Sequence, residues 1–111
     1  MTDYAVESSL FKALSEPMRL QILDMLSCGE MCACDLLKHL PISQPTLSHH
    51  MKALVESGLV QVRRSASWMY YAIDPHRVAE LESLIEALTH PKESCSCMAA
   101  QADCPEGGNE T

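Results

Sequence analysis

The stretch "CDLLKHLPISQPTLSHHMKALVESG", residues 34–58, decides the fold. Its first half carries leucines at helical spacing and ends at Pro41, which predicts a short helix. Its second half starts at Ser43, a natural N-cap residue, and keeps apolar residues at helical spacing until Gly58. Two short helices joined by a three-residue turn have the spacing of a helix-turn-helix.

The residues that follow predict a β-hairpin. In "LVQVRRSASWMYYAI", residues 59–73, valines alternate with polar residues, Ser65-Ala66-Ser67 can turn, and an aromatic strand returns. A hairpin after a helix-turn-helix is typical of a wing.

Helices are also expected on both sides of this unit. Residues 5–14 have helical periodicity, and a second helix should begin after Ser15-Glu16-Pro17, capped by Ser15 or Glu16, and stop at Cys28-Gly29. Residues 76–90 form a last helix whose apolar stripe has little core left to cover, so we expect it to pair with a second subunit. The predicted fold is mainly α with a β-hairpin wing over residues 1–90, and residues 91–111 form a flexible, cysteine-containing tail.

Length and composition suit a single domain. The chain has 111 residues, of which 47% are apolar. No stretch approaches the roughly 20 apolar residues of a membrane span, and a secretion signal is not evident. We therefore expect a cytoplasmic protein that does not enter membranes.

The net charge of −7 is unevenly distributed. Residues 1–35 carry two basic and six acidic groups, and residues 74–111 carry two and eight. Residues 36–73, which hold the helix-turn-helix and the hairpin, carry four basic groups and one acidic group. This pattern fits a phosphate-facing middle segment, although scattered surface charge explains it equally well.

The cysteines occur in a pattern that suggests soft-metal binding. There are six, at positions 28, 32, 34, 95, 97 and 104, including two C-x-C pairs. Because no secretion signal accompanies them, reduced thiols that bind a soft ion are favoured over disulfides or inert cysteines.

Four segments together carry a family resemblance. "LFKALSEPMRLQIL", "GEMCACDL", "SQPTLSHHMKALVESGLV" and "WMYYAI" occur in this order and resemble the ArsR/SmtB family of winged-helix, metal-sensing repressors. The resemblance covers roughly residues 8–90. It implies a homodimer, which we expect to form through the first and last helices, that binds double-stranded operator DNA when metal-free and releases it when metal binds.

The segment "CACDL", residues 32–36, is similar to the arsenic- and antimony-responsive branch in particular. The resemblance thus implies As(III) or Sb(III) as inducer, with Cd(II) or Pb(II) as alternatives. In that branch a third cysteine often follows three residues after the pair, but Leu37 occupies that position here.

Three ligand sets remain open, because trivalent arsenic is soft and favours three sulfurs. The first is a tail site of Cys95, Cys97 and Cys104, which is similar to a cluster in some arsenic-sensing members. The second joins Cys32 and Cys34 to Cys28, and the third joins them to a tail cysteine. Cys28 alone is more typical of a small buried apolar residue.

Helical geometry suggests how the front pair would act. Residues i and i+2 of a helix point about 200° apart, whereas in an extended segment they share a face. Chelation by Cys32 and Cys34 should therefore unwind or hold open the start of the helix in residues 31–40 and favour a conformation that does not fit DNA.

A second metal site is a weaker alternative. Asp74, His76 and His90 resemble part of the zinc site that other family members build on the last helix, but Ala87 stands where a further ligand is needed.

The candidate DNA-binding residues follow from their positions on the recognition helix and hairpin. Base contacts are expected from the first turns of the helix, and phosphate contacts from the basic residues. The first set is Gln44, Thr46, Ser48 and His49, and the second is Lys52, Arg63 and Arg64. Of the adjacent histidines, His49 or His50 should face DNA while the other packs, and Trp68 and Tyr71 are expected to pack in the hairpin.

Other classes of function fit less well. An enzyme such as an arsenate reductase is disfavoured, because the chain has neither a glycine-rich phosphate loop nor a cysteine followed six residues later by arginine. A repressor of the same fold that responds to thiol oxidation, or to cadmium, lead or zinc, remains the alternative.

Overall fold

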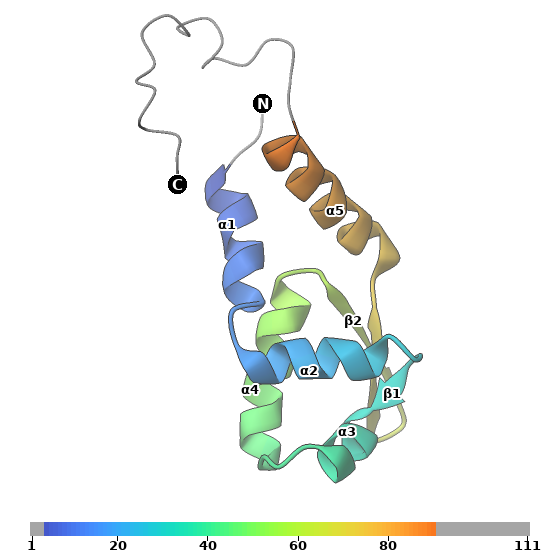
Figure 1. The fold of residues 1–111 in the computed structure, drawn as a ribbon. Coiled ribbons are helices and arrows are strands. Elements are labelled where there is room, and N and C mark those ends of the chain that lie inside the picture. The colour runs from blue at the N-terminus through green and yellow to red at the C-terminus, as the bar shows by residue number, and fades with distance from the viewer. Residues whose placement is uncertain (1–3, 91–111) are drawn as a thin grey trace, which may run out of the picture. The chain divides into compact units, whose positions relative to one another are not determined.

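The structure is a computed structural model that describes residues 4–90. The described chain contains five helices and three strands, in the order α1 (Tyr4–Ala13), α2 (Pro17–Leu26), β1 (Met31–Cys32), α3 (Ala33–His39), α4 (Gln44–Glu56), β2 (Val60–Ser65), β3 (Trp68–Ile73) and α5 (Pro75–Thr89). The strands form one antiparallel sheet in the order β1-β3-β2. This confirms the predicted winged helix-turn-helix, shown in Figure 1.

The boundaries of α4 follow from local chemistry. The Ser43 side chain accepts a hydrogen bond from the Thr46 backbone N–H at 3.3 Å, so Ser43 is the predicted N-cap. Pro45 is tolerated in the first turn because its missing N–H has no intrahelical acceptor. The helix ends before Gly58, whose φ of +86° favours glycine.

The prediction that the side chain of Ser15 or Glu16 caps α2 is wrong. Glu16 occupies the N-cap position, but its side chain makes no cap hydrogen bond. The Ser15 hydroxyl instead donates to the Lys12 carbonyl oxygen at 2.7 Å, satisfying the end of α1. Pro17 reduces the need for a cap, because it has no N–H to satisfy.

One core holds the helix-turn-helix against the sheet. The central side chains come from α2, α3 and its C-cap residue Leu40, α4, β2 and β3, and Figure 1 shows α2 lying across α4. They are Ile22, Leu26, Leu36, Leu40, Leu47, Met51, Leu54, Val60 and Tyr71. Because α3 and α4 both contribute to this core, the orientation of the recognition helix depends on the segment that carries the front cysteines.

The hairpin turn is tight and contains no glycine. Ser65 pairs with Trp68, so Ala66 and Ser67 alone make the turn. Ala66 has a φ of 56°, in the left-handed region that costs a residue with a side chain about 1–2 kcal/mol.

Strand β1 was not predicted from the sequence. Met31 pairs with Tyr71 and Cys32 with Tyr70, which adds a short third strand to the free edge of the hairpin. Two residues are too few to produce a periodic pattern in the sequence. Their strand conformation depends on β3 as a partner.

The chain divides within α5, between Leu81 and Glu82, into two units that are described separately. The boundary predicted at residue 90 lies at the edge of the described residues and stays a prediction. Cys95, Cys97 and Cys104 lie outside the described residues. None of the described helices has the length and apolar character needed to cross a membrane.

Candidate DNA-binding surface and thiol site

The recognition helix α4 presents the predicted base-contacting residues to solvent. Gln44, Thr46, Ser48 and His49 are all exposed, as is Lys52 one turn further along. The Thr46 hydroxyl also accepts a hydrogen bond from the Ser43 hydroxyl at 3.0 Å, so it is part of the helix cap. The first turns of α4 therefore offer polar side chains in the positions from which a helix reads base edges.

The two adjacent histidines have different environments. His49 is exposed, whereas His50 is 9% exposed and accepts a hydrogen bond at Nδ1 from Arg19 Nε, 3.0 Å away. This confirms that one histidine of the pair packs. Desolvation, followed by the charge of Arg19, lowers the pKa of His50, which keeps the imidazole neutral and able to accept this bond.

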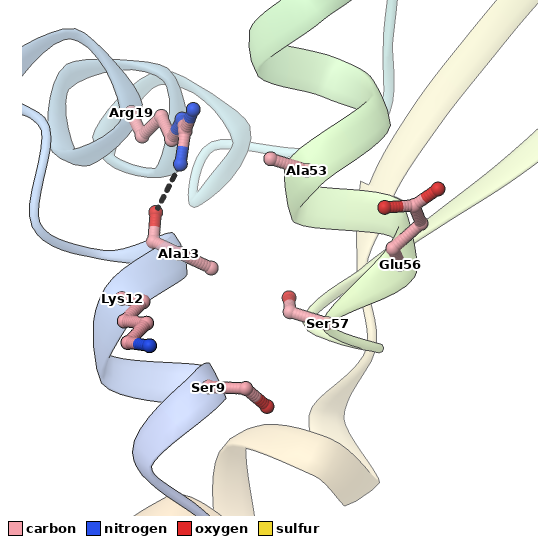
Figure 2. Close-up of a pocket in the computed structure, with 7 residues that line it drawn as sticks. All are labelled: Ser9, Lys12, Ala13, Arg19, Ala53, Glu56 and Ser57. Carbon is pink, nitrogen blue, oxygen red and sulfur yellow. Dashed lines mark hydrogen bonds between the residues drawn. The ribbon is translucent and has the colours of Figure 1, made fainter. Parts of the chain in front are cut away.

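Arg19 fixes the recognition helix to the first two helices. Besides His50, its guanidinium contacts the Ala13 carbonyl oxygen at the end of α1, with the two atoms 3.4 Å apart. Figure 2 shows this bond beside an open cavity of about 320 Å³, into which Ser9 and Lys12 face from α1 and Ser57 from the end of α4. A buried cation that bonds to the end of α1 and to the middle of α4 is a positioning device, because losing either partner leaves polar atoms unsatisfied.

Both arginines that are predicted to contact phosphate lie in the wing, and their bonding partners differ. The Arg63 guanidinium donates from Nε and Nη2 to the two carboxylate oxygens of Glu30, both at 2.8 Å, and lies 4.5 Å from the centre of the Tyr70 ring. Hydrogen bonding to Arg63 lowers the pKa of Glu30, so the pair stays ionised at neutral pH. Arg64 is exposed, and its Nη2 lies 3.9 Å from the Met69 sulfur.

The prediction that both hairpin aromatics pack is half right. Tyr71 is 8% exposed and belongs to the core, whereas Trp68 is 51% exposed. Trp68 is the first residue after the hairpin turn, at the end of β3.

The structure brings the front cysteines together. Cys32 and Cys34 are disulfide-paired, their Cα atoms are 5.4 Å apart, and Cys32 is 7% exposed. A carboxylate oxygen of Asp35 lies within 4.8 Å of both sulfurs. Among the described residues this is the one cluster of three or more cysteine, histidine or acidic side chains close enough to share an ion.

The local backbone explains why residues two apart can meet. Cys32 is extended, with φ −83° and ψ 159°, and α3 begins only at Ala33. Since the pair spans the boundary between a strand and a helix, both sulfurs reach one point with the helix intact. The expectation that chelation unwinds or holds open the start of this helix concerns the ion-bound state and stays a prediction.

Cys28 differs from expectation, whereas zinc binding at Asp74, His76 and His90 stays a weaker alternative. Cys28 is an exposed, free cysteine, not a buried apolar one, because it lies past the end of α2 beside Gly29, whose φ is +137°. Asp74 accepts the His76 backbone N–H at 2.9 Å and caps the start of α5. His90 is exposed, and nothing in the described residues assembles a zinc site around Asp74 or His76.

Three features were missed in the sequence. The Glu30–Arg63 pair and the Arg19–His50 bond join residues 33 and 31 positions apart, and no local pattern indicates such contacts. Strand β1 is the third. Its two residues, Met31 and Cys32, are too few to leave a periodic pattern in the sequence.

The fold and surface define a class of protein: a DNA-binding regulator with a winged helix-turn-helix. Residues 16–62 match the family described as bacterial regulatory protein, arsR family. The chain belongs to this family. It is a DNA-binding transcriptional repressor of the arsR type and not an enzyme.

Known proteins are similar over most of the chain. The arsenical resistance operon repressor of Staphylococcus xylosus is 44% identical over 94 residues, which is 85% of this chain and 90% of that protein. The repressor of the same description from Staphylococcus aureus is 41% identical over 102 residues, or 91% and 98%.

A solved structure supports the same assignment. It is the solution structure of a homodimeric winged helix-turn-helix DNA-binding domain from Mycobacterium bovis, a possible ArsR-family transcriptional regulator. It has a TM-score of 0.65 and 33% identity, and the match covers 77% of this chain and 79% of that chain.

Proposed function

We propose that the protein represses transcription as a homodimer on operator DNA and is released when trivalent arsenic or antimony binds cysteine thiolates. The observation that carries this proposal is the convergence of Cys32 and Cys34 at the junction of the sheet and the helix-turn-helix. Two relatives named as arsenical resistance repressors support the choice of inducer. Such a regulator acts on DNA in the cytoplasm.

The DNA-binding part of the proposal assigns α4 to the major groove. Gln44, Thr46, Ser48 and His49 would contact base edges, and the cations of Lys52, Arg63 and Arg64 would meet phosphates. Arg64 and Lys52 are exposed and available for this role. Arg63 first has to exchange Glu30 for a phosphate, because its Nε and Nη2 donate to that carboxylate.

Dimerisation is assigned to the first and last helices. α1 exposes 39% of Phe11, and α5 buries no residue and exposes 45% of Ile85 and 51% of Leu88. Large apolar side chains left open on a helix are typical of an interface. The related Mycobacterium bovis domain is homodimeric, which supports a two-fold arrangement here.

We assign the binding of the inducer to cysteine thiolates because trivalent arsenic and antimony are soft ions. Trivalent arsenic and antimony prefer sulfur to imidazole or carboxylate, as do cadmium and lead to a lesser degree. Cys32 and Cys34 provide two ligands, and the third comes from Cys28 or from a tail cysteine. A separate site made by Cys95, Cys97 and Cys104 stays an alternative.

A second candidate function is redox sensing. Cys32 and Cys34 are paired as a disulfide, which is the oxidised form that a redox sensor of this kind would use. In that case peroxide, not arsenite, would release DNA.

The test is fluorescence anisotropy of the reduced full chain on its own promoter DNA, titrated with arsenite. The proteins are the wild type, Cys32→Ser/Cys34→Ser and Cys95→Ser/Cys97→Ser/Cys104→Ser. Release lost in the front mutant supports the front site, and release lost only in the tail mutant moves the site to the tail. A wild type released by peroxide and not by arsenite would overturn metalloid induction in favour of redox sensing.

A further inference from the structure

A cavity beside the end of α2 gathers four side chains that can bind a metal ion. It has a volume of about 390 Å³ and is lined by Gln21, Met25, Cys28, Met31 and His39. Two thioethers and one thiol supply sulfur, and the histidine supplies an imidazole nitrogen. Methionine sulfur is a soft metal ligand like cysteine sulfur, so this cavity offers a set of donors that cysteine, histidine and acidic side chains alone do not provide.

The end of α2 places two of the sulfurs on one face. Met25 lies in the last turn of α2, and the Cys28 backbone N–H donates to the Met25 carbonyl oxygen at 3.2 Å. This bond joins residues three positions apart, and side chains with that spacing lie one above the other in a helical turn. The thioether of Met25 and the thiol of Cys28 therefore project on the same side of the helix.

The chain then turns back and adds two more donors. Gly29 has a φ of +137°, which favours glycine, and β1 begins at Met31. Neighbouring side chains of a strand point to opposite faces, so Met31 projects away from the side taken by Cys32. His39 is the last residue of α3. The cavity thus collects its donors from α2, β1 and α3.

These donors are separate from the disulfide-paired cysteines. Cys28 is a free, exposed cysteine, and it is not one of the side chains that lie within 4.8 Å of one another around the disulfide. His39 is exposed as well. Met25 and Met31 are half-buried and pack against the core, which limits the positions that their thioethers can take.

We propose that Met25, Cys28, Met31 and His39 bind a monovalent copper ion, Cu(I), through three sulfurs and one imidazole nitrogen. Thiolate and thioether sulfur are soft ligands that select Cu(I). Zinc takes its ligands from thiolates, imidazoles and carboxylates, so a site with two thioethers disfavours it. Trivalent arsenic favours three thiolates, and this cavity holds one thiol. The inference goes beyond the proposed function and does not depend on it.

The balance of charge and protons fits a monovalent ion. Cys28 must lose one proton to bind as a thiolate, and its negative charge then cancels the positive charge of Cu(I). The two thioethers and the neutral imidazole add no charge. The bound site is therefore neutral, whereas a divalent ion would leave one positive charge beside the core, where net charge is costly. No electron is transferred, and copper stays Cu(I).

The test uses the full chain with every cysteine except Cys28 replaced by serine, and circular dichroism checks that it is folded. The variant is Cys32→Ser/Cys34→Ser/Cys95→Ser/Cys97→Ser/Cys104→Ser. Cu(I) is titrated without oxygen against bicinchoninate, a chelator that is coloured when it holds Cu(I). We expect one Cu(I) per chain. One Cu(I) per two chains would overturn the inference, because the Cys28 thiolates of two chains would then share the ion.

Matched variants of this protein separate the thioethers from the thiol. Met25→Leu and Met31→Leu should each weaken Cu(I) binding by about tenfold or more, since each removes a sulfur and nearly keeps the side-chain volume. Met18→Leu is the control, because Met18 also packs against the core but does not line the cavity. Cys28→Ser should abolish binding. Unchanged affinity in both Met25→Leu and Met31→Leu would show that Cys28 binds copper without the thioethers and would overturn the inference.

A second measurement identifies the ligands in the reduced wild type, so the inference stays testable if the five serine substitutions unfold the chain. The chain has seven methionines, whose methyl groups can be labelled with carbon-13 for nuclear magnetic resonance. Cu(I) should shift the signals of Met25 and Met31 and leave that of Met18 in place, and Zn(II) should shift none of the three. Shifts of Met25 and Met31 that persist in Cys28→Ser, or that do not occur in the wild type, would contradict the site.

Discussion

Cys32 and Arg63 lie in one row of the sheet, each paired with Tyr70 of the central strand. The row is reinforced by Glu30, which holds the Arg63 guanidinium above the Tyr70 ring. The candidate thiol site and a candidate phosphate-contacting residue are therefore joined by backbone pairing and by an ion pair. A change in backbone conformation at Cys32 therefore acts on Arg63 in the wing through Tyr70, with which both residues pair.

Glu30→Gln should strengthen DNA binding at low salt. The substitution removes the carboxylate that pairs with Arg63, so one more cation per subunit becomes available to phosphate. We expect the plot of log K against log salt concentration to steepen by about one unit per subunit, measured by anisotropy at several salt concentrations.

The matched control for this prediction is Glu80→Gln. It removes the same charge from an equivalent ion pair, since Glu80 lies 2.8 Å from Arg77 in α5. An equal steepening in both variants would mean that net charge alone is responsible and that the Arg63 pair has no special role.

Acid should destabilise the protein through His50. Its pKa is lowered in the folded state, so the unfolded chain binds the proton more tightly. The stability that neutral His50 contributes is complete above a pH of about 6.5 and is lost as the pH falls through the lowered pKa. His50→Gln, which keeps an acceptor for Arg19, should flatten this dependence in thermal unfolding followed by circular dichroism. A His50→Gln variant that keeps the slope of the wild type would contradict this role.

Ser43→Ala should destabilise the recognition helix. The Ser43 side chain accepts the Thr46 N–H, and loss of an N-cap costs about 0.5–2 kcal/mol. Denaturant unfolding measures the change, and Ser48→Ala on the same helix should stay within about 0.5 kcal/mol of the wild type. Equal losses in the two variants would contradict the capping role.

Leu36→Ala should cost about 2–5 kcal/mol of folding free energy, because Leu36 is fully buried at 0% exposure and its truncation leaves a cavity. Leu20→Ala on α2 is the control, since Leu20 is 52% exposed and its truncation leaves no buried cavity. Similar midpoints of urea unfolding for the two variants would show that α3 is not part of the cooperative core.

Gln44→Ala and Lys52→Ala should weaken DNA binding in different ways. Loss of a base contact should reduce affinity for promoter DNA by about 1–3 kcal/mol more than for unrelated DNA. Loss of a phosphate contact should weaken both equally and reduce the salt slope by about one unit. If the two variants behave alike, Gln44 does not read a base.

The sequence by itself determined the helix-turn-helix and the wing, because their signals are local. Ser43 and Gly58 bound the recognition helix through contacts with residues a few positions away, and the alternation around Val60 depends only on the pleat of a strand. The same holds for Cys32 and Cys34, whose spacing indicated a shared site.

Only the tertiary structure decided what lies beside these elements. Arg63 pairs with Glu30, and Cys28 and Trp68 are exposed at the surface. Cys34 lines a cavity formed by α3, α4 and the wing. Each of these outcomes depends on strand pairing or helix packing between residues far apart in the chain. Such contacts depend on how the whole core packs, and they produce no periodic pattern in the sequence around the residues that make them.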